Sequence, residues 1–245
     1  MDSPLKIVTF NIQAAIGTLA LSHYVTRAHR QLFDNNAKQS LLNDISDYIS
    51  AYDIAFLQEV DLGGRRAGFL CQVDLLSSAA KFADYAVQEN RVVRHLSRHG
   101  NAILSQHALH DVTDIKLPGR VQGRGAISAR IQRHEPVTLV NLHLSLGERD
   151  QIIQLDYIAD QLDPNENIIV CGDFNCAPTS KPIQRFAKAL SLTPLTSNEC
   201  KTYPSWKPRQ ALDHILASKG MDSENIKVDE IILSDHRPVT AEVRV

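Results

Sequence analysis

The segment 168–175 (IIVCGDFN) constrains the fold of this chain more than any other. Its apolar start is typical of a buried strand. Gly172 then lets the backbone turn sharply, and Asp173 and Asn175 follow two residues apart, so both can face one side of an extended segment. A buried strand that ends in a carboxylate and an amide is a natural place for a functional site. A strand followed by an Asx-type turn is the alternative interpretation.

The composition indicates an ordinary globular chain. Of its 245 residues, 43% are hydrophobic and 22% are charged, and the net charge of −2 attracts the chain neither to nucleic acid nor to an anionic membrane. The N-terminus does not resemble a signal peptide, no stretch could span a bilayer, and the four cysteines match no zinc-ligand spacing. We therefore expect a cytoplasmic monomer with reduced thiols and no transmembrane segment.

The hydrophobic pattern predicts strands mixed with amphipathic helices. Strands are predicted at 6–12, 53–60, 98–105, 125–131, 136–144, 168–175, 212–217, 226–233 and 239–245, and helices at 36–51, 71–83, 148–162 and 180–190. Residues 13–34 show no clear periodicity. No segment rich in Pro, Gly or Ser separates these elements, so a single domain over residues 1–245 is expected.

Polar residues stand at the ends of six predicted strands, where a buried strand would otherwise avoid them. They are Asn11, Glu59, His143, Asp173 with Asn175, Asp213, and Asp235 with His236. Oxygen ligands gathered from separate strand ends favour a hard divalent cation such as Mg²⁺ over zinc. Histidines beside carboxylates suit phosphate contact or proton transfer. Together these residue types indicate hydrolysis of a phosphoester, in which a metal polarises the phosphoryl oxygens and a carboxylate positions water.

Seven short motifs in order resemble those of the endonuclease/exonuclease/phosphatase family. They are FNI at 10–12, LQEV at 57–60, GNAILS at 100–105, NLHL at 141–144, GDFN at 172–175, LDHI at 212–215 and SDHRP at 234–238. Each motif is weak alone, but their order over nearly the whole chain is specific. The resemblance implies an α/β (α+β) fold, a four-layer α/β/β/α sandwich of two packed mixed β-sheets with outer helices and the site at one end.

The resemblance also implies roles for the polar residues. Asn11 and Glu59 resemble the family's metal site, with Asp235 as a nearby carboxylate, so the expected cofactor is Mg²⁺ or Mn²⁺. Asp173 resembles the residue that orients or deprotonates the attacking water, and Asn175 resembles a donor to the phosphoryl oxygens.

Two histidines complete the implied set. Asp213 and His236 resemble the family's Asp–His pair, in which the carboxylate fixes the tautomer and the charge of the imidazole. His143 resembles the second phosphate-contacting histidine of the deoxyribonuclease and sphingomyelinase branches, which counts against the exonuclease III-like branch. The stretch 143–149 is similar to bacterial sphingomyelinase-like phosphodiesterases, whereas the long segment 13–34 and His99 before Gly100 depart from the family pattern.

These features imply a metal-dependent phosphodiesterase that uses water as the nucleophile. Its partner would be a phosphodiester substrate: a small molecule, a lipid head group or a nucleic acid. A DNA or RNA nuclease of the same fold is the alternative, and a catalytically silent binding module is a third. Residues 91–133 carry eight Lys or Arg against two Asp, which indicates either a solvated surface or a phosphate-binding one.

Overall fold

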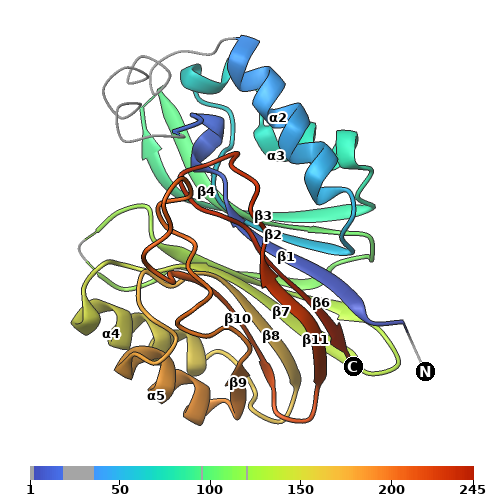
Figure 1. Cartoon of the computed structure of the whole chain (residues 1–245), viewed down its shortest axis with the longest axis vertical. Helices are drawn as coiled ribbons and strands as arrows, with labels where there is room; N and C mark the ends of the chain where they lie inside the picture. The colour runs from blue at the N-terminus through green and yellow to red at the C-terminus, as the bar shows by residue number, and fades with distance from the viewer. Residues whose placement is uncertain (1–2, 19–35, 95, 120) are drawn as a thin grey trace.

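Two six-stranded sheets packed face to face form the centre of the protein (Figure 1). The structure is a computed structural model that describes residues 3–18, 36–94, 96–119 and 121–245. The first sheet has the order β11 (Asp222–Val228), β12 (Val239–Arg244), β1 (Leu5–Asn11), β2 (Ile54–Asp61), β4 (Ser97–Ser105) and β3 (Asp84–Val93). The second has the order β5 (His110–Ile115), β6 (Gly125–Gln132), β7 (Pro136–His143), β8 (Asn167–Asp173), β10 (Asp213–Ser218) and β9 (Leu192–Pro194).

Both sheets are mixed. Strands β1 and β2 are parallel, as are β7 and β8, and the other pairs are antiparallel. A parallel pair needs a crossover connection. Helix α2 (Asn36–Ile49) precedes β2 in the first sheet, and α4 (Glu148–Ala159) connects β7 to β8 in the second. The carboxyl ends of each parallel pair therefore lie at the same edge of their sheet.

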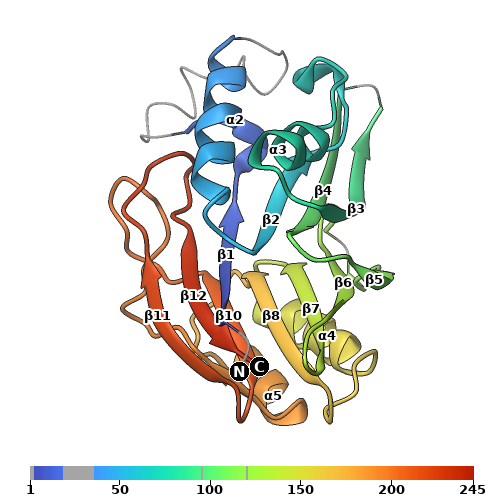
Figure 2. The ribbon, with the colours of Figure 1, turned by 90° about the vertical axis from the view of Figure 1, so that its right-hand side faces the viewer.

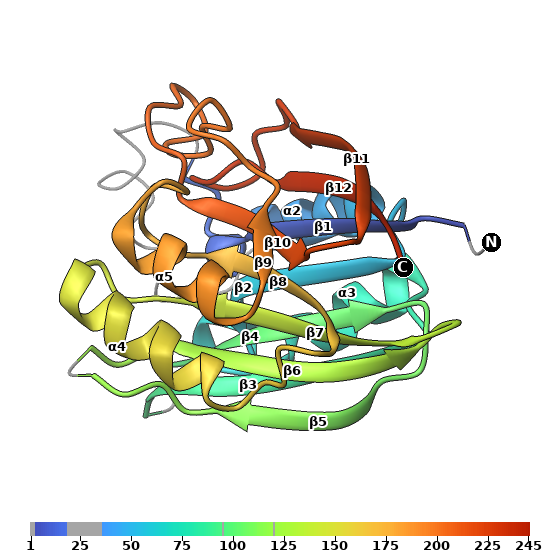
Figure 3. The same cartoon turned by 90° about the horizontal axis from the view of Figure 1, so that it is seen from below.

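Helices cover the outer face of each sheet. Helix α2 and α3 (Gln72–Ala80) pack on the first sheet (Figure 2), and α4 and α5 (Lys181–Ala189) pack on the second (Figure 3). The core between the sheets contains Ile7, Phe56, Leu139, Ile169 and Ile215. Central strands are buried on both faces, which is why they are nearly continuous apolar runs. This is the predicted four-layer α/β/β/α sandwich.

A polar contact joins the two sheets inside this core. Asn141 of β7 donates from Nδ2 to the carbonyl oxygens of Leu57 and Ala102, both at 2.8 Å. Its Oδ1 accepts a hydrogen bond from Gln58 Nε2 at 2.7 Å. Buried amides that are bonded in this way hold one relative position of the sheets. Asn141 is therefore a structural residue of the NLHL motif.

Gly172 is required by the close approach of β7 and β8. Its φ angle is +149°, and a Cβ added there would lie 2.0 Å from the carbonyl oxygen of Leu142. A side chain at this position would collide with backbone that cannot move aside. The glycine therefore lets β8 run alongside β7 up to Asp173.

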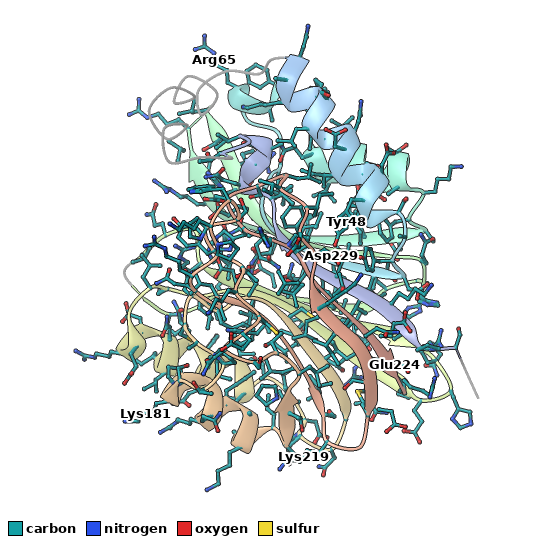
Figure 4. All side chains as sticks on the ribbon, in the orientation of Figure 1. Tyr48, Arg65, Lys181, Lys219, Glu224 and Asp229 are labelled. Atoms are coloured by element: carbon teal, nitrogen blue, oxygen red, sulfur yellow. The ribbon has the colours of Figure 1, made fainter. Side chains whose placement is uncertain are left out.

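The strand predicted at 226–233 is wrong. The observed β11 ends at Val228, and residues 229–238 form a loop that leads into β12. The apolar run at 231–233 suggested a strand, but β11 is a partly exposed edge strand with a register shift and no such run. Asp229 ties the loop to α2, because its Oδ2 accepts hydrogen bonds from the hydroxyls of Tyr48 at 2.7 Å and Tyr52 at 3.1 Å (Figure 4).

Three strands that the pattern did not predict are β3, β5 and β9. The first two are edge strands with largely exposed side chains, so they lack the apolar alternation of a half-buried strand, and β9 has only three residues. The other predicted elements are present within a few residues of their expected ends. Of the segment 13–34, Gln13–Ala15 form a short 3-10 helix (η1), and residues 19–34 lie outside the described residues. No helix in the described ranges is both long and apolar enough to cross a bilayer.

Candidate active site

The polar strand ends meet at one end of the sandwich, away from the chain N-terminus (Figure 1). In the second sheet, Asp173 pairs in register with His143 on one side and with Asp213 on the other. In the first sheet, Asn11 pairs with Gln58, next to Glu59. The loop before β12 brings Asp235 and His236 to the same place. Contacts described below connect all eight predicted residues.

Asn11 is the link between the two sheets at the site. Its Nδ2 donates to Asp173 Oδ2 at 3.1 Å and approaches Glu59 Oε1 at 3.4 Å. Its Oδ1 accepts a hydrogen bond from the backbone N–H of Gln13. The Gln13 side chain in turn donates to Asp235 Oδ2 at 2.9 Å. Asn11 thus holds the carboxylates of both sheets in one arrangement, which explains a poor strand former at the end of a buried strand.

Glu59 owes its position to an irregularity in β2. The register of β2 against β4 shifts between Leu57 and Val60, and the φ angle of Glu59 is +56°. A bulge re-aims a side chain, and a non-glycine residue in the left-handed region is a strained conformation that functional sites often retain. The bulge turns Glu59 into the site instead of leaving it in the alternation of the strand.

Asn175 lies in a turn and not on an extended segment, so the expectation of two side chains facing one side of an extended strand is wrong. Strand β8 ends at Asp173, and Asn175 has a φ angle of +54°. The backbone N–H of Asn175 donates to Asp173 Oδ1 at 3.0 Å, which makes an Asx turn. Its side-chain amide donates to the carbonyl oxygen of Leu144 at 2.8 Å. The turn and the polar site therefore coexist, and one amide hydrogen of Asn175 is left for a ligand.

Asp213 and His236 form a buried pair. His236 Nδ1 lies 2.8 Å from Asp213 Oδ2, which also accepts a hydrogen bond from Thr202 Oγ1 at 2.5 Å. The ring of Tyr203 lies 4.9 Å from that of His236, measured between centroids. Burial acts to lower the pKa of His236, but the carboxylates of Asp213 and Asp173 outweigh it and raise this pKa well above its usual value. His236 is therefore held as an imidazolium, with Nε2 directed toward Asp173 at 3.9 Å.

Asp173 lies between the two histidines. Its Oδ2 is 3.4 Å from His143 Nε2. Burial and the charge of Asp213 raise the pKa of Asp173 above its usual value. Burial, together with the positive charges of Arg124 and His236, lowers the pKa of His143 well below its usual value, so His143 is neutral. The two imidazoles thus differ in charge because His236 is bonded to Asp213, whereas buried His143 lies beside the guanidinium of Arg124.

A hard cation fits beside Glu59. Within the described residues, the Glu59 carboxylate accepts only the long contact from Asn11, and burial together with the charge of Asp235 raises its pKa. The Glu59 carboxylate thus has little compensation for its charge and needs a positive partner. Its oxygens, with those of Asp235, suit Mg²⁺ or Mn²⁺. Asn11 presents its nitrogen to the carboxylates of Glu59 and Asp173, so its own place among the metal ligands stays a prediction.

A second group of donors is less suitable for a metal. Ligand atoms of Asp173, Asp213 and His236 lie within 4.8 Å of one another. However, Asp213 Oδ2 already accepts two hydrogen bonds, and His236 Nδ1 is bonded to it. An imidazolium has no free lone pair, so a metal bound to this group would have to displace the proton of His236 Nε2, and the group beside Glu59 is the better candidate.

A cavity of about 130 Å³ opens next to Glu59 and His143. Its wall includes His99, Arg124 and Asn90. The guanidinium of Arg124 contacts the ring of His143.

The sequence patterns did not single out three residues that contact the site: Arg124, Gln13 and Thr202. None of them belongs to one of the seven motifs. Only the excess of basic residues over 91–133 pointed to Arg124. His214, adjacent to Asp213, points away and bonds Thr196 and the Cys176 carbonyl.

Comparisons with known proteins identify the family and the fold. The model of the Endonuclease/Exonuclease/phosphatase family matches residues 8–236. The catalytic domain of human Nocturnin with a bound sulfate anion is 21% identical with a TM-score of 0.74, over 100% of this chain and 95% of that one. Bacteroides thetaiotaomicron mannosyl-6-phosphatase Bt3783 is 15% identical with a TM-score of 0.75, over 98% and 100%. Beta toxin from Staphylococcus aureus is 17% identical with a TM-score of 0.67, over 97% and 99%.

At these identities, the three structures establish the shared fold and nothing finer. No protein with a curated description matches the sequence. The family match covers most of the chain, from within β1 to His236 of the Asp–His pair. The members of this family are hydrolases that act on phosphoesters. The chain belongs to the endonuclease/exonuclease/phosphatase family.

Proposed function

We propose that the protein is a divalent-metal-dependent phosphodiesterase that hydrolyses its substrate by attack of water. The observation that carries the proposal is the position of Asp173. Its carboxylate lies between a neutral and a charged histidine, and Asn11 connects it to Glu59. Phosphoester hydrolysis requires a base, a positive charge such as an imidazolium, and a metal site, all in contact with one another.

Each residue has a chemical role in this proposal. Glu59 and Asp235 would hold Mg²⁺ or Mn²⁺, which supplies Lewis-acid polarisation of the phosphoryl oxygen. Asp173 orients water and accepts its proton; its raised pKa makes it a stronger base than an exposed aspartate. His236 places positive charge against the developing charge of the phosphoryl group, and Asp213 keeps it protonated and oriented.

The remaining residues bind the phosphoryl group. Neutral His143 donates a hydrogen bond from one ring nitrogen, and Arg124 adds a fixed charge beside it. Asn175 offers its remaining amide hydrogen. We propose a small or lipid-derived phosphodiester as the substrate, because the net charge of −2 does not favour a polyanion. A nuclease is the second candidate, and the basic residues that line the cavity are the observation in its favour.

An activity panel tests the proposal. Bis-p-nitrophenyl phosphate, p-nitrophenyl phosphate, sphingomyelin, plasmid and abasic DNA are incubated with the protein, with Mg²⁺ or with a chelator. The expected result is metal-dependent cleavage of a diester by the wild type and loss of this cleavage in Asp173→Asn. The variant excludes a contaminating enzyme, since it should fold normally. Hydrolysis of the monoester alone, or equal activity of the variant, would contradict the proposal.

A further inference from the structure

The basic stretch 91–133 separates into two groups in the structure. Arg98 pairs with Glu89, Arg130 pairs with Glu166 and Asp111, and Arg133 donates to the Ser3 carbonyl oxygen. By contrast, Arg91, Lys116 and Arg124 form no ion pair within the described residues, and all three line cavities at the active-site end. The charge of the first group is used within the fold, whereas the charge of the second is available to a ligand.

These three cations border a groove made of two adjoining cavities. The cavity at Glu59 and a neighbouring cavity of about 370 Å³ share the walls formed by Asn90, Arg91 and Arg124. Lys116 lines only the second cavity, and His143 lines only the first. The carboxylate in the lining of the second cavity, Glu89, is paired with Arg98. The second cavity is therefore positive, whereas the first also contains the carboxylate of Glu59.

The groove has a defined shape because both of its walls are held in place. Its walls come from the end of β3 and from the segment between β5 and β6, which belong to different sheets. The backbone N–H of Gly123 donates to the Asn90 carbonyl oxygen at 3.3 Å, and the side chain of Arg91 lies against Gly123, with its Cδ 3.4 Å from the position of an added Cβ. Gln88 donates to the carbonyl oxygens of Ile115 and Ala126 across the same junction.

Polar atoms in the wall lack partners. Asn90 Oδ1 and Arg124 Nε are both buried, and neither has a hydrogen-bond partner among the described residues. Such atoms cost free energy unless a ligand or water satisfies them. Val92 and Val121 are about half exposed and line the groove near Arg91. The second cavity thus offers cations together with the apolar surface of Val92 and Val121.

We propose that this groove binds a second phosphate group of the substrate. The scissile phosphodiester lies at His143 and Arg124, the second phosphate lies at Arg91 and Lys116, and the organic part that joins them covers Val92 and Val121. Arg91 is then a specificity-determining residue, since a guanidinium binds a phosphate through two parallel hydrogen bonds. The inference rests on the proposed phosphodiesterase function and gives it a substrate class: diesters that carry a further phosphate.

Matched substrates test the inference. Thymidine 3′-(p-nitrophenyl phosphate) is compared with the same compound carrying a 5′-phosphate, and glycerophosphoinositol with its 4-phosphate, so the two arms distinguish a nucleotide from a polyol source. The wild type should prefer the doubly phosphorylated member of at least one pair by about tenfold or more in kcat/KM, the value of a charge-assisted contact. In Arg91→Gln the kcat/KM values for the two members of the pair should differ by about twofold or less.

Arg94→Gln is the matched control. Arg94 is exposed, precedes β4 by a few residues and lines neither cavity, so the variant removes the same charge without touching the groove. It should keep the wild-type preference. The inference would be overturned if the wild type had equal kcat/KM values for the two members of each pair. It would also be overturned if Arg91→Gln kept the wild-type preference.

A binding measurement separates this inference from the proposed function. Titration calorimetry compares thymidine 3′,5′-bisphosphate with thymidine 3′-phosphate, and inositol 1,4-bisphosphate with inositol 1-phosphate. If the protein hydrolyses none of the diesters but binds a bisphosphate more tightly, and Arg91→Gln abolishes the difference, the groove assignment holds while the phosphodiesterase proposal fails. If bisphosphates and monophosphates bind equally, the groove assignment fails whatever the activity.

Discussion

Replacement of Asp213 by Asn removes one charge from the site at nearly constant shape. Asp213 is fully buried; its Oδ2 accepts hydrogen bonds from His236 and Thr202, and its Oδ1 accepts none from the part of the chain that the structure describes. If the Asn oxygen takes the place of Oδ2, its NH₂ group is buried without an acceptor. A buried unsatisfied donor costs about 1–3 kcal/mol, which corresponds to a decrease of roughly 2–12 °C in the melting temperature of a domain of this size.

The effect of Asp213→Asn on catalysis should exceed its effect on stability. Asp213 is the largest of the causes that raise the pKa of His236, so this pKa decreases in the variant. A raised pKa keeps the imidazolium present as the pH rises; once the pKa is lower, the imidazolium is lost at a lower pH. The alkaline limb of the kcat profile should therefore shift to lower pH. At neutral pH the turnover should decrease by about 10²–10⁴, with partial recovery as the pH is lowered.

The assay is kcat as a function of pH on a chromogenic diester, together with calorimetry of the same samples. Asp229→Asn is the control, because it makes the same change at a carboxylate that, within the described residues, bonds Tyr48, Tyr52 and Lys227 and no residue of the site. This control should lose stability and keep the wild-type pH profile. An Asp213→Asn protein with wild-type turnover and an unshifted alkaline limb would remove the Asp–His pair from the mechanism.

Three other changes have defined outcomes. Asp173→Asn should keep its melting temperature within a few degrees, since Asn also forms the Asx turn, and should lose about 10²–10⁴ in turnover; preserved turnover would reduce Asp173 to a turn residue. Glu59→Gln should weaken Mg²⁺ binding by about tenfold or more in titration calorimetry, and unchanged affinity would place the metal elsewhere. Tyr48→Phe should lower the free energy of unfolding by about 1 kcal/mol at neutral pH. Burial acts to raise the pKa of Asp229, but hydrogen bonds from Tyr48 and Lys227 outweigh it and lower this pKa. The stability from this carboxylate is therefore present above its unfolded pKa of about 4 and is lost as the pH falls through the lower folded pKa. Urea unfolding at neutral and at acid pH should show that the free energy of unfolding decreases less on acidification in Tyr48→Phe than in the wild type. An equal decrease would refute the link between Tyr48 and the lowered pKa of Asp229.

Much of the fold could be predicted from local pattern. Strands such as β1, β2 and β8 lie between a helical layer and the other sheet, so their apolar runs are long and visible in the sequence. Edge strands β3 and β5 face solvent and were not visible. The apolar run at 231–233 was misleading because the loop that carries site residues packs Leu233 against the core, leaves Ile232 exposed and forms no ladder.

The residue types of the site were equally visible in the sequence, because buried strands otherwise avoid carboxylates and amides, and such residues at strand ends therefore stand out. The sequence alone determined which side chains are available: Asn11, Glu59, Asp173, Asp213 and His236.

Their charges were decided only by the tertiary structure. His236 and His143 are the same residue type, yet one is charged and the other neutral, because the fold places Asp213 beside the first and Arg124 beside the second. Likewise, eight basic residues are alike in the sequence, and only packing determines which of them meet a carboxylate. Burial and through-space charge depend on neighbours from distant parts of the chain, which no local pattern contains.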